Sequence, residues 1–223
     1  MGNSCAGGTK KTQKKNNAPA KTTALDLKLR EVMQAHGKSS LKSLNSLLMK
    51  FSTVGAGFQD CRNAFEEYDR NKNGTIERKE LKEVLDQVEG LDANACDEIF
   101  KNADMNGDDV ISFKEFIVAL TLAYFSKSKD GKMSLQLGRF EESIAVAIDA
   151  FIFFDTDLDG TLQKEEVLST FNQATSSARS SRGAPHASRQ RFEEMDWDAD
   201  GTISFTEFLF ALTGWAGIEE DDE

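Results

Sequence analysis

Apolar residues recur along most of this chain at spacings of three and four positions, which is the spacing that forms one face of an α-helix. The repeats flank four polar stretches, and an aromatic residue lies four positions before the first Asp of each: Phe65, Phe100, Phe151 and Phe192. Beyond each stretch the apolar spacing resumes, in the pairs Leu81 and Leu85, Phe116 and Leu120, Val167 and Phe171, and Phe208 and Leu212. The pattern predicts an all-α fold built from four helix–loop–helix units.

The polar stretches are twelve residues long and carry oxygen-bearing side chains at alternate positions: 69–80, 104–115, 155–166 and 196–207. Calcium is a hard cation that takes about six to eight oxygen ligands, which EF-hand loops supply from positions one, three, five, seven and twelve. The residues at these positions are Asp69, Asn71, Asn73, Thr75 and Glu80; Asp104, Asn106, Asp108, Val110 and Glu115; Asp155, Asp157, Asp159, Thr161 and Glu166; and Asp196, Asp198, Asp200, Thr202 and Glu207. Position seven would contribute its backbone carbonyl, and Glu at position twelve both carboxylate oxygens. The sequence therefore predicts up to four Ca²⁺ ions as the cofactor.

The loops differ in their charge and in the residue at position six. Carboxylates at positions one, three, five and twelve number two, three, four and four in chain order, so we expect tighter binding in the C-terminal pair. Position six needs a positive φ, which glycine adopts freely, but the second loop has Asp109 there at a cost of about 1–2 kcal/mol. The loop 104–115 is therefore expected to be the weakest site.

The residues at position eight indicate how the loops pair. Ile76 should lie opposite Ile111, and Leu162 opposite Ile203, in short antiparallel β contacts between paired loops. Pairing the hands in sequence order gives two lobes. The predicted division is a flexible basic arm at 1–24, N-terminal helices with the first lobe at 25–125, a linker at 126–138, the second lobe at 139–217, and an acidic tail at 218–223.

Two further helical stripes precede the first loop. One contains Leu25, Leu29, Val32 and Met33, and the other contains Leu41, Leu44, Leu47, Leu48 and Phe51. The second stripe has Lys42 and Lys50 on its other faces, which makes it a basic amphipathic segment. The grooves of calcium sensors typically bind segments of this kind, so the second stripe could be a releasable internal ligand. We favour the alternative of a helix that packs over the first lobe.

The N-terminal arm carries two candidate lipidation sites. Gly2 follows the initiator Met, which is the acceptor position for N-myristoylation, and Cys5 lies three residues further on as a candidate for palmitoylation. Position six, where Ser or Thr is usual, is Ala6. One myristoyl chain binds membranes only marginally, so a second chain or a basic patch is needed, and the arm offers Cys5 and a Lys cluster. The alternative is an ordinary Lys-rich tail.

Charge and cysteine usage narrow the classes of function. The formal net charge is −11, which argues against a nucleic-acid partner. Residues 1–50 carry ten Lys or Arg against two acidic residues, so a basic arm joins an acidic body. Three cysteines without a disulfide spacing fit a reducing compartment, and no apolar run is long enough to span a membrane. With His36 and His186 as its only histidines and no phosphate-binding loop or nucleophile constellation, the chain is not expected to be an enzyme.

The four loops and the segment Phe192–Asp198, which reads Phe-Glu-Glu-Met-Asp-Trp-Asp, give the chain a family resemblance. Over roughly residues 40–218 it resembles the calmodulin-like calcium sensors of plants and green algae, in the branch with a lipidated N-terminus. The resemblance implies lobes that open on binding calcium and then bind an amphipathic helix of a target protein. The chain has 16 Phe and six Met, so its groove should be stiffer than the Met-rich grooves of calmodulin.

Three interpretations of function follow. The first is a calcium sensor that regulates a target protein, cytoplasmic and peripheral on the cytosolic face of a membrane. The second is a calcium buffer, whose lobes would barely open. The third is a regulatory subunit of a phosphatase or kinase, similar to calcineurin B, which would hold a stable partner without calcium.

Overall fold

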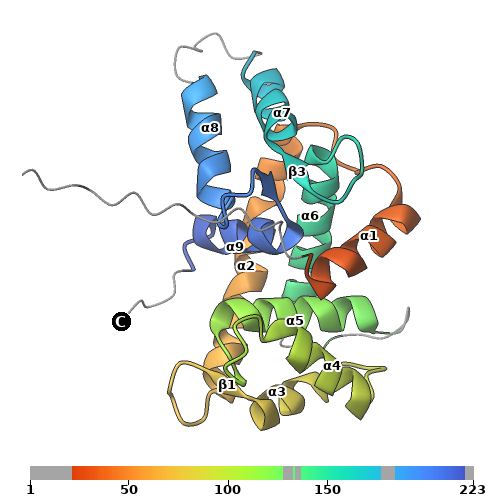
Figure 1. Cartoon of the computed structure of the whole chain (residues 1–223), viewed down its shortest axis with the longest axis vertical. Coiled ribbons are helices and arrows are strands. Elements are labelled where there is room, and N and C mark those ends of the chain that lie inside the picture. The colour runs from red at the N-terminus through yellow and green to blue at the C-terminus, as the bar shows by residue number, and fades with distance from the viewer. Residues whose placement is uncertain (1–21, 128–132, 134–136, 177–183, 219–223) are drawn as a thin grey trace, which may run out of the picture.

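The computed structural model describes residues 22–127, 133, 137–176 and 184–218 as helices joined by short loops (Figure 1). The helices are α1 (Ala24–His36), α2 (Leu44–Tyr68), α3 (Arg78–Leu85), α4 (Ala93–Ala103), α5 (Phe113–Ser126), α6 (Gly138–Phe154), α7 (Lys164–Ser176), α8 (Ala184–Met195) and α9 (Phe205–Trp215). Four two-residue strands lie in the loops: β1 (Ile76–Glu77), β2 (Val110–Ile111), β3 (Leu162–Gln163) and β4 (Thr202–Ile203). The predicted all-α class is confirmed.

The strands join the hands in pairs. β1 runs antiparallel to β2 with Ile76 opposite Ile111, and β3 runs antiparallel to β4 with Leu162 opposite Ile203. All four of these side chains are buried, so each pair closes the apolar core beneath two calcium loops. The predicted register is confirmed in both lobes.

The two lobes repeat the same aromatic packing in their cores. In the first lobe Phe65 lies edge-on to Phe113 and Phe116, with ring centroids 5.5 and 5.4 Å away. In the second lobe Phe151 lies edge-on to Phe205 and Phe208, at 5.3 and 5.5 Å. Edge-to-face pairs add about 0.5–1.5 kcal/mol each beyond the area they bury, so these rings hold the entering and leaving helices together.

The helix α2 differs from the expectation of a separate helix around residues 41–51. It runs for 25 residues without a break, and its second half is the entering helix of the first loop. The helix packs against α6 and also meets α7 and α9 (Figure 1). Leu44, Leu47 and Phe51 of its first half line a cleft of the second lobe, so this half covers the second lobe instead of the first. The sequence spacing showed that Leu44, Leu47 and Phe51 share a face, but it could not show which lobe buries that face.

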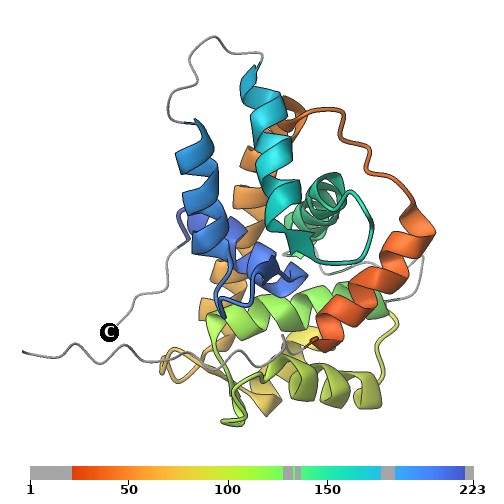
Figure 2. The same cartoon turned by 45° about the horizontal axis from the view of Figure 1, so that its top comes forward.

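The helix α1 lies between the lobes, where Figure 2 shows it beside the end of α5. It contacts α5 of the first lobe and α9 of the second, and it buries Leu25, Leu29 and Met33. Thr23 caps it in a capping box with Asp26, and the Thr23 hydroxyl also lies 3.2 Å from that of Thr206 on α9. Among the described residues no helix is both long and apolar enough to cross a membrane.

Candidate calcium sites

Each candidate loop begins where its entering helix ends. The backbone N–H of Asp69, Asp104, Asp155 and Asp196 donates to the carbonyl of the aromatic residue four positions earlier, each time at 2.9 Å. The aromatic side chains are buried in the lobe cores. Burial of one ring therefore fixes the place of the first ligand, which explains why the aromatic residue and the Asp keep the same spacing in every hand.

The first Asp of each loop folds the chain around itself. Its carboxylate accepts hydrogen bonds from the backbone N–H groups of positions five or six. These bonds curl the first half of the loop around the carboxylate. These bonds run to Asp69 from Asn73 and Gly74, to Asp104 from Asp108 and Asp109, to Asp155 from Gly160, and to Asp196 from Asp200 and Gly201. Because a carboxylate satisfies these donors, the loop keeps its shape without a regular ladder of backbone bonds.

The Glu at position twelve joins the two ends of its loop. In the fourth loop Glu207 accepts the N–H of Trp197 at 3.0 Å and the N–H of Ser204 at 2.8 Å, on different carboxylate oxygens. The same pair of contacts recurs at Glu80, Glu115 and Glu166. The last ligand is thus already turned into the loop that holds the first one.

Position nine has a role that was readable in the sequence but was not recognised there. Ser112 and Ser204 cap α5 and α9, and each forms a reciprocal capping box with the Glu three residues later. The pattern Ser-x-x-Glu before an apolar run is the signature of this cap. Glu115 and Glu207 therefore serve both as candidate calcium ligands and as helix caps.

Backbone strain does not set the second loop apart. Asp109 at position six adopts a φ of 64°, as expected, but position four of every loop is also left-handed. There the second loop has Gly107, with a φ of 75°, whereas the other loops have the non-glycine residues Lys72, Leu158 and Ala199. Each loop thus places one non-glycine residue at positive φ. The ranking of 104–115 as the weakest site stays a prediction, but strain at Asp109 does not single it out.

Two groups of three carboxylates in the described residues have oxygens close enough to share one ion, and both groups lie in the second lobe. Carboxylate oxygens of Asp155, Asp157 and Asp159 lie within 4.8 Å of one another, as do those of Asp196, Asp198 and Glu207. Oδ1 of Asp155 is buried and has no hydrogen-bond partner among the described residues. A buried carboxylate oxygen without a donor suits a cation, so this donor set fits Ca²⁺.

Crowding and burial disfavour the charge of these groups when no metal is bound. Burial raises the pKa of Asp155 from 3.8 to about 6, and the neighbouring Glu166 adds to the shift. Burial likewise raises the pKa of Asp196 and of Glu207 above their usual values. A bound cation would reverse this penalty, because it stabilises the ionised form of each ligand.

A cation from outside the loop lies against the third site. The side chain of Arg30, on α1, packs over Gly160, and a Cβ at that glycine would lie 2.7 Å from both Cγ and Nε of Arg30. Gly160 is therefore required both for its positive φ of 85° and for the close approach of α1. The contact joins residues far apart in sequence, so no local motif could have revealed it.

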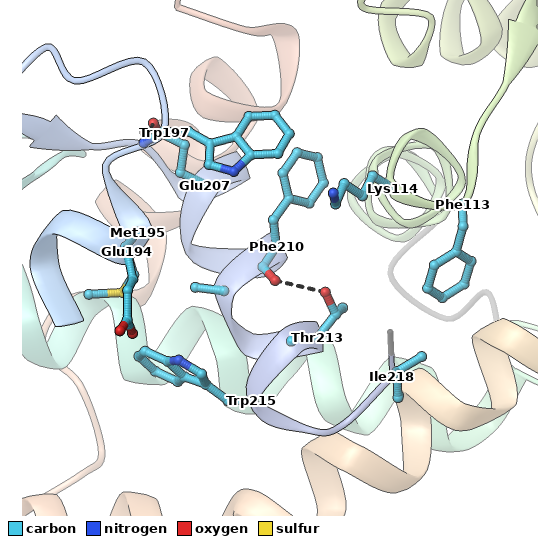
Figure 3. Close-up of a pocket in the computed structure, with 12 residues that line it drawn as sticks. Phe113, Lys114, Glu194, Met195, Trp197, Glu207, Phe210, Thr213, Trp215 and Ile218 are labelled. Atoms are coloured by element: carbon cyan, nitrogen blue, oxygen red, sulfur yellow. Dashed lines mark hydrogen bonds between the residues drawn. The ribbon is translucent and has the colours of Figure 1, made fainter. Parts of the chain in front are cut away.

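A cavity of about 550 Å³ adjoins the fourth loop, between the two lobes (Figure 3). Trp197, at position two of the loop, packs on Phe210 with ring centroids 5.6 Å apart. Nζ of Lys114, from the start of α5, lies 4.9 Å from the centroid of the Trp197 ring. Glu207 also lines the cavity, so a candidate calcium ligand forms part of the cavity wall.

The predicted lipidation sites Gly2 and Cys5 lie outside the described residues.

Comparison with known proteins assigns the same regions to one family. A model of the EF-hand domain pair matches residues 58–121, and an EF-hand model matches residues 148–171 and 189–210. Calcium-binding protein CML21 of Arabidopsis thaliana is 34% identical over 90% of this chain and 87% of its own length. Calcium-binding protein CML22 of the same plant is 36% identical over 91% and 93%. Calcineurin B of Candida glabrata is 27% identical over 79% and 91%.

The fold and its loops define a calcium-binding EF-hand protein. The chain belongs to the calmodulin-like family of these proteins, as the two Arabidopsis relatives show. It is a calcium-binding protein and not an enzyme.

Proposed function

We propose that this chain is a calcium sensor that regulates a target protein through an apolar groove on its second lobe. The observation that carries the proposal is a cleft of about 460 Å³ to which every helix of that lobe contributes. Phe154 of α6, Phe171 of α7 and Leu212 of α9 give it an apolar lining, and Arg191 of α8 adds a positive charge. Grooves of this kind bind the apolar face of an amphipathic helix.

The sensor is distinguished from a buffer by whether calcium exposes this groove. We expect an apolar fluorescent dye to bind the full chain with calcium and to be released by a chelator. A buffer would bind calcium without the dye signal, because its lobes barely open. Absence of a calcium-dependent signal, with calcium binding confirmed by calorimetry, would refute the sensor.

A regulatory subunit is the second candidate. It is favoured by the similarity to calcineurin B, whose Candida glabrata and Naegleria gruberi forms are 27% and 28% identical to this chain. A subunit of this kind would copurify with one partner in the presence of a chelator. The sensor would instead recover its targets from an extract only when calcium is present.

A membrane location would place this sensor near its target. The supporting features are Gly2 and Cys5 as acyl acceptors and the Lys cluster between them and α1. Two weak anchors are needed because one myristoyl chain binds only marginally. Expressed in plant cells, Gly2→Ala and Cys5→Ser should each move the chain from the membrane to the soluble fraction. Unchanged membrane recovery of Gly2→Ala would refute myristoylation.

A further inference from the structure

The first half of α2 lies in the groove that the proposed function assigns to a target. Leu44, Leu47, Leu48 and Phe51 line the cleft together with the side chains of the second lobe. Their positions follow the spacing i, i+3, i+4 and i+7, which is how a bound amphipathic helix presents its anchors. The ring of Phe51 lies 6.4 Å from that of Trp215, and Leu47 is buried. The segment thus sits where an external helix would sit.

The fit of this segment is looser than that of a core helix. Leu48 lines the cleft yet remains 59% exposed, and Met49 beside it is 83% exposed. The cleft next to these residues keeps a volume of about 460 Å³. The second half of α2 is different, because Phe58, Cys61 and Phe65 are almost fully buried. One helix therefore joins a tightly packed half to a half that only partly fills its groove.

A single carboxylate on α6 holds the segment at both ends. Asp149 accepts hydrogen bonds from the Ser39 hydroxyl at 2.8 Å and from the Ser40 N–H at 2.7 Å, before α2 begins. It also lies 3.9 Å from Nζ of Lys50, within α2. Although burial alone would raise the pKa of Asp149, the bonds from Ser40 and Ser39 and the charge of Lys50 hold it below the usual value. Asp149 therefore stays ionised as a latch on residues 39–50.

We propose that residues 44–51 are an internal ligand of the second lobe, which an external helix must displace. This inference rests on the proposed function and names its partner by chemistry. The partner is an amphipathic helix with large apolar residues at i, i+3, i+4 and i+7 and a flanking Lys or Arg that Asp149 can pair with. The groove accepts a partner only in the fraction of molecules whose own segment has left it, so the apparent affinity is the intrinsic affinity multiplied by that fraction.

The internal ligand also connects the two lobes. The C-cap of α2 is Asp69, which is the first candidate ligand of the first calcium loop. A calcium ion at 69–80 would act on the end of the same continuous helix whose other end fills the groove of the second lobe.

The test compares Asp149→Ala with Glu142→Ala in the full chain. Both substitutions remove one carboxylate from α6, but Glu142 is exposed and lies about two turns nearer the start of that helix. The probe is a fluorescein-labelled, end-blocked synthetic peptide of residues 41–53 in which Lys50 is replaced by Gln, so that loss of Asp149 removes contacts from the internal segment and no ion pair from the probe. Its binding is followed by anisotropy with and without calcium. Loss of the latch bonds should tighten binding by about tenfold in Asp149→Ala and leave Glu142→Ala like the unchanged protein.

Hydrogen exchange in the unchanged protein supplies a readout that needs no variant. Saturating peptide should remove the amide protection of residues 44–51 and leave that of residues 58–68 intact. Equal affinities of the two variants, or protection at 44–51 that persists while the peptide is bound, would overturn the internal ligand. Peptide binding that is independent of calcium, yet still tighter in Asp149→Ala, would refute the sensor and uphold the internal ligand.

Discussion

Gly57 of α2 lies directly against Ser143 of α6, with no space for a side chain between them. The Ser143 hydroxyl donates to the carbonyl of Thr53 at 2.8 Å and so ties the two helices together at this crossing. Close by, Nε of Arg139 donates to Asp60 at 2.6 Å, and Phe58 packs edge-on to Phe140. The crossing fixes how α2 passes from the groove of the second lobe to the first hand.

Substitution of Gly57 should therefore loosen this crossing. A Cβ there would overlap the Ser143 hydroxyl and the Arg139 carbonyl, and the carbonyl cannot move without the helix. We expect Gly57→Ala to lower the free energy of unfolding by about 1–3 kcal/mol, even though Ala favours helices. Gly55→Ala is the matched control, because its Cβ would meet Ala216 at an ordinary 3.7 Å. Denaturant unfolding that ranks the two variants equally would contradict the close approach.

Strain in the second loop can be tested at its two left-handed positions. Asp109→Gly should stabilise the first lobe by about 0.5–1 kcal/mol, since glycine adopts the positive φ without a steric penalty. Gly107→Ala should destabilise it by a similar amount, because its φ is 75°. A Cβ at this position would meet no other atom, so backbone strain alone would cause the effect. Calorimetric calcium titration and thermal unfolding of the two variants measure these effects. A neutral Gly107→Ala would contradict the prediction that a non-glycine residue is strained at position four of the loop.

The loops could be predicted from the sequence because their determinants are local. The first Asp, the Glu at position twelve and the partners Ile76 and Ile111 follow from spacing alone. The structure confirms the pairing of Ile76 with Ile111, and it shows the Gly74 N–H donating to Asp69. Chemistry at fixed offsets needs no knowledge of distant contacts.

The packing of the N-terminal helices could not be predicted as well from the sequence. A 3.6-residue period shows that one face of residues 44–51 is buried, but it does not identify the surface that buries it. Gly57 stands in the middle of α2 because α6 passes too close there for a side chain. The contact of Arg30 with Gly160 and the latch at Asp149 likewise join segments more than a hundred residues apart.

The metal-free protein should lose stability as the pH rises through about 6. The folded chain holds the proton of Asp155 more tightly than the unfolded chain, since the folded pKa is about 6 against an ordinary 3.8. Its contribution is thus fully present below the unfolded pKa and disappears above the folded one, a change of about 3 kcal/mol. Asp155→Asn should flatten this part of the pH dependence in calcium-free denaturant unfolding. A dependence of the unfolding free energy on pH that is unchanged in the variant would contradict this prediction. A smaller loss of stability with rising pH should remain in the variant, because burial also raises the pKa of Asp196 and of Glu207.

Calcium should fill the second lobe before the first, because each of its loops offers four carboxylates at the ligand positions whereas loop 69–80 offers two. Trp197 can report this order, since its backbone N–H donates to Glu207 and its ring packs on Phe210. In a Trp215→Phe protein, which keeps Trp197 as its single Trp, the emission change should be complete within the first two equivalents of calcium. Glu207→Gln should shift that transition to calcium concentrations roughly tenfold higher. Glu80→Gln, the matched change in the first loop, should leave it in place; an equal shift in both variants would show that the lobes do not fill in this order.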